Sequence, residues 1–332
     1  MKTRWLMFGL LFLSLPFAAC NGSCDDDDDN NDDSSPEPYG WPDNPGPVEG
    51  WFATWQASGW ELFRIANNLI TLEEGPGNEL FIGGALANTH QGLAVSADHL
   101  YKLTEEGWNF LLDGPPCEYF FSQPFLNDNG DIVIGCADPA ERWYRIENIW
   151  QSIPFTDVAY FHMSCLNMDR CMFWRDDAAV VCSRLECEGI TELPFGEYKQ
   201  FVWRDTNRLY ALLLDYDGED SFSYPYQYDL QTKKWKEETR VAPNGESLFT
   251  RINEEYVVYS QQIDPEVYIL DGDDGLVEHD WPFLYRMIFA PGGGGIGISA
   301  DGFVQLIGTD YLPLAAYPGG YMEDFFVVAD AE

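Results

Sequence analysis

Six cysteines in the middle of this chain have spacings that favour disulfide bonds over a metal site. In order they are Cys117, Cys136, Cys165, Cys171, Cys182 and Cys187. No Cys-x-x-Cys spacing occurs and no histidine completes a zinc-binding pattern, so zinc is the weaker alternative. Each successive pair flanks a predicted β-hairpin. We therefore expect the local pairs 117–136, 165–171 and 182–187 among the connectivities that six cysteines allow.

The histidines, serines and glycines form no catalytic constellation. The four histidines are His90, His99, His162 and His279, and none has a second histidine at metal-ligand spacing. No Gly-x-Ser-x-Gly sequence and no phosphate-binding loop occur. The glycine run 292–295 is not followed by Lys-Ser or Lys-Thr, so we predict a tight turn there. The sequence assigns no catalytic residue, and it favours a non-enzymatic protein without deciding the question.

Two acidic loops have carboxylates at alternate positions, and calcium takes oxygen ligands from such loops. They are residues 215–220, DYDGED, and residues 271–275, DGDDG. Neither has a glycine at its sixth position and a glutamate at its twelfth, so turn aspartates are the simpler interpretation. We assign no metal site and no cofactor, and calcium is the one cofactor that stays open.

The charge of the chain argues against nucleic acid as a partner. The 332 residues include 56 acidic and 18 basic side chains, which gives a net charge of −38. Such a surface repels nucleic acid, whose binding depends on neutralised phosphates. It suits a soluble protein or one that attracts cations. Because acids are so frequent, the sequence cannot single out a carboxylate pair for sugar hydrolysis.

The first residues predict export. Lys2 and Arg4 form a positive start, and residues 5–17 are apolar but too few to span a bilayer comfortably. The sequence Phe17-Ala18-Ala19-Cys20 resembles the lipobox of bacterial lipoproteins, with Phe17 where that family prefers leucine. The resemblance implies a signal peptide at residues 1–19 and a lipid on Cys20. Simple secretion with an early cysteine is the alternative.

Residues 20–48 predict a disordered acidic tether after the lipidated cysteine. Aspartates at 25–29, 32 and 33 repel one another, prolines follow, and apolar side chains are scarce, so folding cannot offset the ordering entropy. Such a tether would hold a domain at residues 49–332 away from the bilayer. The resemblance implies a lipid anchor in the bacterial cell envelope, periplasmic or surface-exposed. The outer membrane is favoured, and inner versus outer stays open.

A strand-turn-strand pattern recurs seven times after residue 49. Equivalent positions are Phe63, Tyr101, Tyr144, Cys182, Tyr228, Tyr268 and Val304, at spacings of 38, 43, 38, 46, 40 and 36 residues. A period near forty, built from short alternating strands, is typical of a β-propeller with one four-stranded blade per repeat. We therefore predict an all-β fold.

We predict seven blades, with six as the alternative. Residues 51–58, WFATWQAS, supply only one inner strand, and residues 323–330, EDFFVVAD, form a strand with no outer pair after it. If the last strand completes the first blade, the N- and C-terminal strands share a blade and the propeller closes without exposed edges.

Two of the repeats resemble kelch repeats. The order Phe81-Ile82-Gly83-Gly84, then Tyr101, then Trp108 is similar to the kelch order of strand, double glycine, tyrosine and tryptophan. Residues 226–230 with Trp235 resemble the second half of such a repeat. The chain thus resembles a degenerate kelch-like propeller. This supports the fold and assigns no function, because propellers host many.

From these features we expect a lipid-anchored propeller that binds a protein or a glycan. Loops at one rim of a propeller vary freely, and aromatic side chains there can anchor a partner. An enzyme acting on extracellular polysaccharide, with its site in the propeller channel, is the second hypothesis. A structural component of an envelope assembly is the third. The sequence names neither the ligand nor the loop face that binds it.

Overall fold

Short strands and tight turns make up the regular structure of this protein. The computed structural model describes residues 47–56, 59–67, 69–73, 80–96, 98–111, 113–121, 123–155, 160–190, 196–217, 220–237, 247–251, 256–261, 267–271, 275–279, 284–290, 294–299, 301–307, 310–316, 318 and 321–331. Within these ranges no residue is helical, and no helix could cross a membrane. The predicted signal peptide, Cys20 and nearly all of the predicted tether lie outside the described residues.

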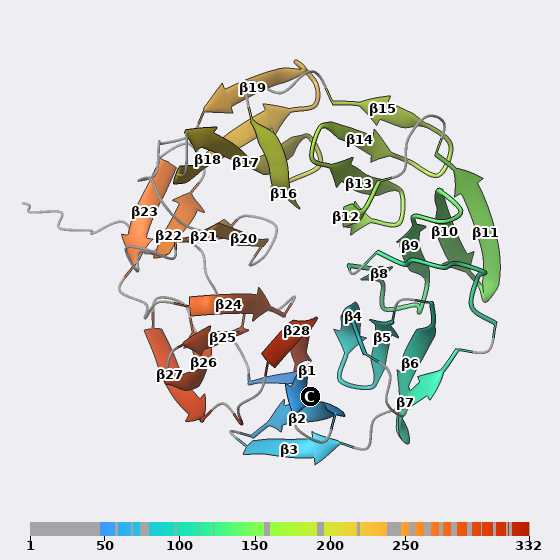
Figure 1. Ribbon diagram of the computed structural model, residues 1–332, viewed down its shortest axis with the longest axis vertical. Coiled ribbons are helices and arrows are strands. Elements are labelled where there is room, and N and C mark those ends of the chain that lie inside the picture. Colours follow the sequence, from blue (N-terminus) through green and yellow to red (C-terminus); the bar gives the residue numbers. More distant parts are fainter. Residues whose placement is uncertain are drawn as a thin grey trace, which may run out of the picture. The chain divides into compact units, whose positions relative to one another are not determined.

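The described strands form seven antiparallel sheets of four strands each, numbered here along the chain (Figure 1). The first contains β28 (Tyr321–Asp330), β1 (Val48–Gln56), β2 (Gly59–Ala66) and β3 (Leu69–Glu73). The second contains β4 (Gly83–Asn88), β5 (Gln91–Val95), β6 (Leu100–Thr104) and β7 (Gly107–Phe110). The third contains β8 (Phe125–Leu126), β9 (Ile132–Cys136), β10 (Glu141–Ile146) and β11 (Ile149–Pro154).

The other four sheets repeat this order. The fourth contains β12 (His162–Asn167), β13 (Arg170–Arg175), β14 (Ala178–Cys182) and β15 (Cys187–Gly189). The fifth contains β16 (Glu197–Trp203), β17 (Arg208–Asp217), β18 (Asp220–Asp229) and β19 (Lys234–Glu237). The sixth contains β20 (Ser247–Arg251), β21 (Tyr256–Gln261), β22 (Val267–Asp271) and β23 (Gly275–His279). The seventh contains β24 (Leu284–Phe289), β25 (Gly295–Ser299), β26 (Gly302–Ile307) and β27 (Asp310–Ala315).

The first strand of each sheet is the innermost one, and these seven strands contact each other in a cycle. β28 contacts β4, and β4 contacts β8. The contacts continue in chain order through β12, β16, β20 and β24, and β24 contacts β28. The labels in Figure 1 follow the same order around the centre. Each sheet therefore has one neighbour on either side, as a β-propeller requires.

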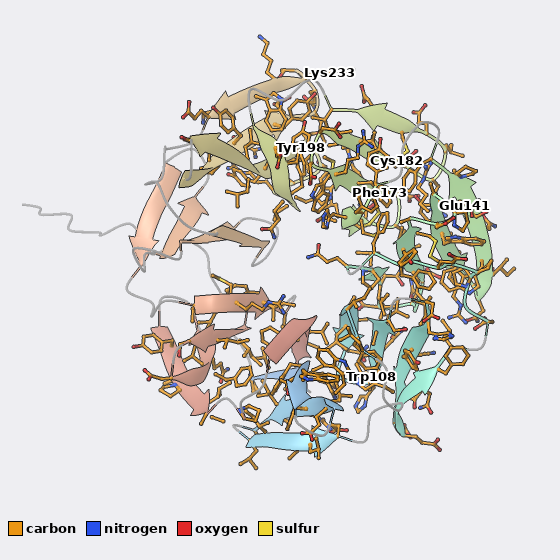
Figure 2. All side chains as sticks on the ribbon, in the orientation of Figure 1. Trp108, Glu141, Phe173, Cys182, Tyr198 and Lys233 are labelled. Atoms are coloured by element: carbon orange, nitrogen blue, oxygen red, sulfur yellow. A yellow bond between two sulfur atoms is a disulfide. The ribbon has the colours of Figure 1, made fainter. Side chains whose placement is uncertain are left out.

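Buried side chains fill the space between neighbouring sheets. In the fourth sheet, Phe173 packs with Tyr144 of the third sheet, whereas the next residue, Trp174, packs with Tyr198 and Phe201 of the fifth. Phe173 and Tyr198 are labelled in Figure 2. This alternation follows from the two-residue period of a strand. Each fully buried large side chain stabilises the fold by roughly 1.5–3 kcal/mol, so apolar side chains on both faces of such a strand hold it to both neighbouring sheets.

Turn residues with positive φ set the hairpins. Glu147 and Asn148 connect β10 to β11 with φ values of 48° and 67°, the conformation that a type I′ turn requires at both central positions. Gly107 has φ 98° where β7 begins, a conformation that costs glycine little.

The outer hairpins agree with the repeat pattern of the sequence. All seven equivalent positions, from Phe63 to Val304, fall in the third strand of their sheet. The predicted kelch-like glycines, Gly83 and Gly84, begin β4, while Tyr101 and Trp108 lie in β6 and β7. The all-β prediction is confirmed for the described residues.

The two terminal strands pair with each other. β1 and β28 are antiparallel, with Phe52 opposite Phe326, and the Ala331 N–H donates to the Pro47 carbonyl at 2.8 Å. β1 begins at Val48, the last residue of the predicted tether. The first sheet therefore joins both ends of the described chain.

Candidate functional site

The antiparallel order gives every sheet two ends with different loops. Because successive strands run in opposite directions, the turns between first and second strands and between third and fourth strands lie at one end, which we call the turn face. The turns between second and third strands lie at the other end, together with the connections from sheet to sheet. We call that end the connection face.

An open groove of about 800 Å³ lies at the connection face between the second and third sheets. Its walls are the turn between β5 and β6, the connection from β7 to β8, and the turn between β9 and β10. The lining residues are Asp98, Pro116, Cys117, Glu118, Tyr119, Asp138 and Pro139. The groove therefore combines three carboxylates with one phenol ring and two proline rings.

The connection that forms one wall of the groove is fixed to the third sheet. A disulfide joins Cys117 to Cys136, and the Ala137 N–H donates to the Tyr119 carbonyl at 2.9 Å. Further along, Phe121 packs so close to Gly135 that a β-carbon there would lie 2.0 Å from the ring. Residues 118–121 thus extend the short strand β8 along β9, and this gives the groove a fixed wall.

Two acidic residues face each other across this wall. The Glu118 N–H donates to the Asp138 carbonyl at 2.9 Å, and both residues are exposed. Like charges at facing positions destabilise a strand pair. Within the described part of the chain, neither side chain has a cationic partner, although Asp113 pairs with Arg145 at 3.2 Å. The main chain and the disulfide therefore hold two exposed acidic residues at opposite positions of the wall.

The third carboxylate of the groove pairs with a histidine. Asp98 Oδ1 lies 3.0 Å from His99 Nδ1. The His99 ring meets Phe110 edge to face, with ring centroids 5.0 Å apart. The turn between β5 and β6 thus adds a carboxylate, an imidazole and an aromatic ring to the same end of the second sheet.

Aromatic side chains are exposed along the connection face of the first four sheets. Tyr119 is 61% exposed at the groove, and Trp55, at the end of β1, is 51% exposed. Trp55 meets Trp60 with centroids 5.1 Å apart. Phe161 is exposed before β12, where His162 stacks on Trp174 at 5.4 Å. Exposed rings of this kind anchor partners in many interfaces.

The turn face of the same sheets differs. The large apolar side chains that are exposed at its hairpin turns are aliphatic: Leu69, Ile149 and Leu185. In the described residues of the first four sheets, the exposed aromatic rings and the groove therefore gather at the connection face, which we take as the candidate binding site. Tyr311, at the turn face of the seventh sheet, is exposed as well.

The six cysteines of the folded region form three disulfides. They are 117–136, 165–171 and 182–187, in agreement with the local pairing expected from the hairpins. The first bridge belongs to the groove. The other two lie in the fourth sheet, near the turn face.

The remaining candidate residues do not come together. His90 lies in the turn between β4 and β5, His162 begins β12, and His279 ends β23. The acidic loops fall at the β17–β18 and β22–β23 turns, and their side chains lie outside the described residues. In the described ranges, no group of three or more His, Cys, Asp and Glu could hold a metal. The glycine run connects β24 to β25, where the Ala290 N–H donates to the Gly294 carbonyl.

A buried arginine and tyrosine lie between the third and fourth sheets. Arg142 is 2% exposed, with its guanidinium 5.7 Å from the centre of the Phe155 ring. The Tyr144 hydroxyl donates to the Ser183 carbonyl at 3.4 Å. Burial raises the pKa of Tyr144, and Arg142 partly opposes that shift. Both side chains lie within the core, so we assign them to packing rather than to a reaction.

No sequence pattern predicted the groove. Its acids and prolines are scattered over three loops of two repeats, and no short motif joins them. The one signal in the sequence was the predicted 117–136 disulfide, which indicated that the connection after the second repeat is bonded to the third repeat.

Solved β-propellers are similar to this chain in structure. A catalytically inactive virginiamycin B lyase from Staphylococcus aureus with quinupristin has a TM-score of 0.56 at 10% identity, over 81% of this chain and 94% of the lyase. YCF48 bound to D1 peptide has a TM-score of 0.58 at 11% identity, over 80% and 95%. The WD40 β-propeller domain of Doa1 has a TM-score of 0.54 at 9% identity, over 80% and 94%.

These likenesses show the fold alone. No protein-family model matches the chain, and no curated protein matches it significantly in sequence. The three neighbours include an enzyme and a protein solved with a peptide, so a shared fold cannot select between catalysis and binding.

Proposed function

We propose that this β-propeller is a protein-binding module that takes a basic segment of its partner at the connection face. The observation that carries the proposal is the groove, where the carboxylates of Glu118 and Asp138 face each other without a cationic partner in the described chain. A lysine or arginine side chain would remove their repulsion. Its aliphatic stem would pack on the Tyr119 ring and the proline rings.

The charge of the whole chain supports the same choice. A net charge of −38 attracts basic partners over long range and speeds their encounter, whereas it repels acidic ones. Trp55 and Phe161 on neighbouring sheets would extend the contact with apolar area. YCF48, whose fold is similar, is solved with a peptide bound.

Binding of short peptides tests this proposal. The full chain with Cys20→Ser is titrated with a peptide of lysine, arginine and tyrosine residues, and with a matched peptide in which glutamate replaces each basic residue. We expect binding of the basic peptide alone, weakened as salt is added. Glu118→Gln with Asp138→Asn should weaken it by about tenfold, as expected for the loss of about 1.4 kcal/mol.

The matched control makes the same charge change on the turn face. Glu105 and Glu106 lie in the turn between β6 and β7 and are exposed. Glu105→Gln with Glu106→Gln removes the same two negative charges and should leave affinity within about twofold. If both double variants weaken binding equally, the groove is not the binding site, and the peptide is attracted only by the net charge of the protein.

The same exposed aromatics favour a glycan as the second candidate ligand, because aromatic rings pack against sugar faces. Incubating the chain with a panel of polysaccharides distinguishes the candidates. Retention without turnover would favour a glycan-binding module, and turnover would favour the polysaccharide-acting enzyme. Neither result is expected if the basic segment is the ligand.

We propose further that Cys20 carries a lipid that anchors the protein in a bacterial envelope, with the outer membrane favoured. The support is the sequence alone: the positive start, the apolar segment and Ala18-Ala19-Cys20. Metabolic labelling with an alkyne fatty acid should mark the wild-type chain and leave Cys20→Ser unlabelled. Labelling of both chains would contradict the anchor.

We also propose that residues 49–332 form a closed propeller of seven blades, with β1 and β28 in one blade. Support comes from the seven described sheets and from the cycle of contacts among their innermost strands. The kelch-like character is proposed only for the second and fifth blades, on the residues that carry the resemblance.

A further inference from the structure

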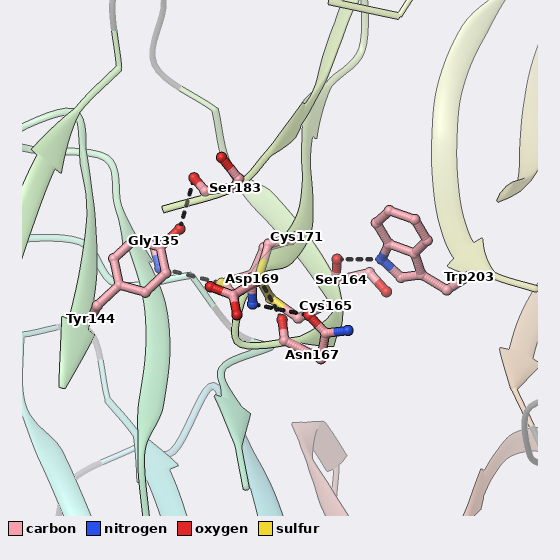
Figure 3. The surroundings of a disulfide bond; sticks show 10 residues. Gly135, Tyr144, Ser164, Cys165, Asn167, Asp169, Cys171, Ser183 and Trp203 are labelled. Carbon is pink, nitrogen blue, oxygen red and sulfur yellow. Dashed lines mark hydrogen bonds between the residues drawn. A yellow bond between two sulfur atoms is a disulfide. The ribbon is translucent and has the colours of Figure 1, made fainter. Parts of the chain in front are cut away.

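Four cysteines form a row across the fourth sheet. Cys165 of β12 is opposite Cys171 of β13, Cys171 is opposite Cys182 of β14, and Cys182 is opposite Cys187 of β15. One cysteine thus stands on each strand, at matched register. The two disulfides join the outer pairs of the row, and Figure 3 shows the Cys165–Cys171 bridge.

The row faces one side of the sheet. Cys165, Cys171 and Cys182 belong to the apolar cluster shared with the third sheet. Cys171 and Cys182 are fully buried, Cys165 is half-buried and Cys187 is exposed. Facing residues of antiparallel strands have α-carbons about 4.5–5.5 Å apart, and disulfides span about 4.4–6.8 Å. The central pair, Cys171 and Cys182, is therefore placed as a third disulfide would be.

We propose that this row is a thiol–disulfide exchange site, which accepts an external thiol at Cys187 and delivers a free thiol at Cys165. This activity is independent of partner binding at the connection face, because the row lies near the turn face of a different sheet. The chemical class of the co-reactant is a thiol, either a small molecule such as glutathione or a protein dithiol.

The exchange takes two balanced steps. An external thiolate attacks the exposed Cys187 sulfur, forms a mixed disulfide there, breaks the Cys182–Cys187 bond and leaves the electron pair on Cys182. The Cys182 thiolate then attacks Cys171, forms a Cys171–Cys182 bond and expels the Cys165 thiolate, which takes a proton from water. The number of disulfides is conserved, and no further oxidant or reductant is needed.

The register of the strands favours the second step. The attacking, central and leaving sulfurs come from β14, β13 and β12, three adjacent strands, so they follow each other in one line across the sheet. Beyond the row, Arg184 donates two hydrogen bonds to the Asp169 carboxylate and so connects the two hairpin turns. This ion pair helps to keep β13 and β14 in register while the bridges change.

Mapping of disulfides after limited exchange tests the proposal. The full chain is treated with one equivalent of glutathione, and the exchange is quenched with acid. Free thiols are then alkylated under acidic conditions, and the protein is digested with trypsin. Cleavage after Arg170, Arg175, Arg184 and Lys199 places each of the four cysteines in a separate peptide. Mass spectrometry can therefore assign each bond without ambiguity.

We expect glutathione on Cys187, a peptide pair joined by Cys171–Cys182, and alkylated Cys165, in equal amounts. The Cys117–Cys136 bridge has no cysteine beside it in its sheet and should stay intact as the internal control. Alkylated Cys182 with an intact Cys165–Cys171 bridge would overturn the proposal, and so would glutathione on Cys165 or the absence of any reaction.

Two variants separate exchange from simple reduction. In Cys187→Ala, Cys182 has lost its disulfide partner and is a thiol before any glutathione is added. The Cys171–Cys182 bond and the free Cys165 thiol should therefore form spontaneously. Cys182→Ala removes the relaying sulfur, so glutathione should leave Cys165–Cys171 closed. If a variant fails to fold, the wild-type mapping still decides the question. An intact Cys165–Cys171 bridge in folded Cys187→Ala would contradict the relay.

Discussion

Single residues of the groove wall have steric roles that substitution can measure. A β-carbon at Gly135 would lie 2.0 Å from the Phe121 ring, which is itself buried. Gly135→Ala should therefore destabilise the protein by roughly 1–3 kcal/mol, the usual cost of overpacking. Thermal unfolding followed by circular dichroism measures the effect.

Gly189 provides the matched control for that substitution. It also lies in a strand, β15, but nothing is within 4 Å of a β-carbon built there. Gly189→Ala should change stability by less than about 0.5 kcal/mol. If both variants unfold at the wild-type temperature, Phe121 does not pack on Gly135 as described.

A buried tyrosine makes stability depend on alkaline pH. Burial raises the pKa of Tyr198 above its ordinary value of 10.0, because the fifth-sheet core disfavours the phenolate. The folded chain keeps this proton at a pH at which the unfolded chain loses it. The stabilisation is therefore complete below pH 10 and is lost as the pH rises through the folded-state pKa.

Tyr198→Phe removes this dependence. We expect the variant to lose less stability than the wild type between pH 9 and pH 11 in urea unfolding, with roughly equal stability at pH 7. Tyr119→Phe, which removes an exposed hydroxyl, is the control and should follow the wild type. If the stability of Tyr198→Phe falls with alkaline pH as steeply as that of the wild type, groups other than Tyr198 cause the loss.

At the scale of elements, the outer hairpins could be predicted from the sequence and some inner strands could not. Third strands such as β6 and β10 carry aromatic and aliphatic residues next to clear turn signals. β8 has only two residues. The rest of this inner edge is made by residues 118–121, which are held along β9 by main-chain hydrogen bonds and by the Cys117–Cys136 disulfide. No periodicity can develop over two residues, so propensity alone could not locate this strand.

The candidate site was harder to predict than the sheets. Core positions repeat with the blades, whereas Asp98, Glu118 and Asp138 occur in loops that differ from repeat to repeat. Their proximity depends on the stacking of the second sheet against the third. The disulfide pairs were predictable because each bridge joins cysteines that are close in sequence and flank one predicted hairpin.

The Cys117–Cys136 bridge should stabilise both the fold and the groove. It closes a loop with a sequence separation of 19 residues, against 5 for Cys182–Cys187. On loop entropy alone, the losses are about 3 and about 2 kcal/mol. Cys117→Ala with Cys136→Ala should therefore unfold at the lower temperature and should also weaken binding of the basic peptide.

The control is Cys182→Ala with Cys187→Ala, which removes a bridge near the turn face of another sheet. Its affinity for the basic peptide should remain that of the wild type, measured by isothermal calorimetry at one salt concentration. A loss of affinity in the control alone would show that the groove does not depend on its own bridge.

For the molecule as a whole, the two termini complete one sheet. β28 contributes Val327 to the core shared with the second sheet, while Phe326 and Val328 pack in the core shared with the seventh. A single strand thus covers two neighbours. Its removal would expose both cores and leave β1 as an unpaired inner edge.

A pair of truncations tests this closure. Deletion of residues 321–332 should lower the unfolding temperature by roughly 10 °C or more, because several buried side chains are lost and each kcal/mol shifts a domain of this size by roughly 2–4 °C. Deletion of residues 1–46, before the first described strand, should leave the temperature unchanged. Val327→Asp, which buries an unpaired charge, should reproduce much of the first effect without shortening the chain. β28 is both the last strand of the chain and the innermost strand of the first sheet. Equal unfolding temperatures for the two truncations would therefore mean that the sheets hold together without the pairing of β1 with β28.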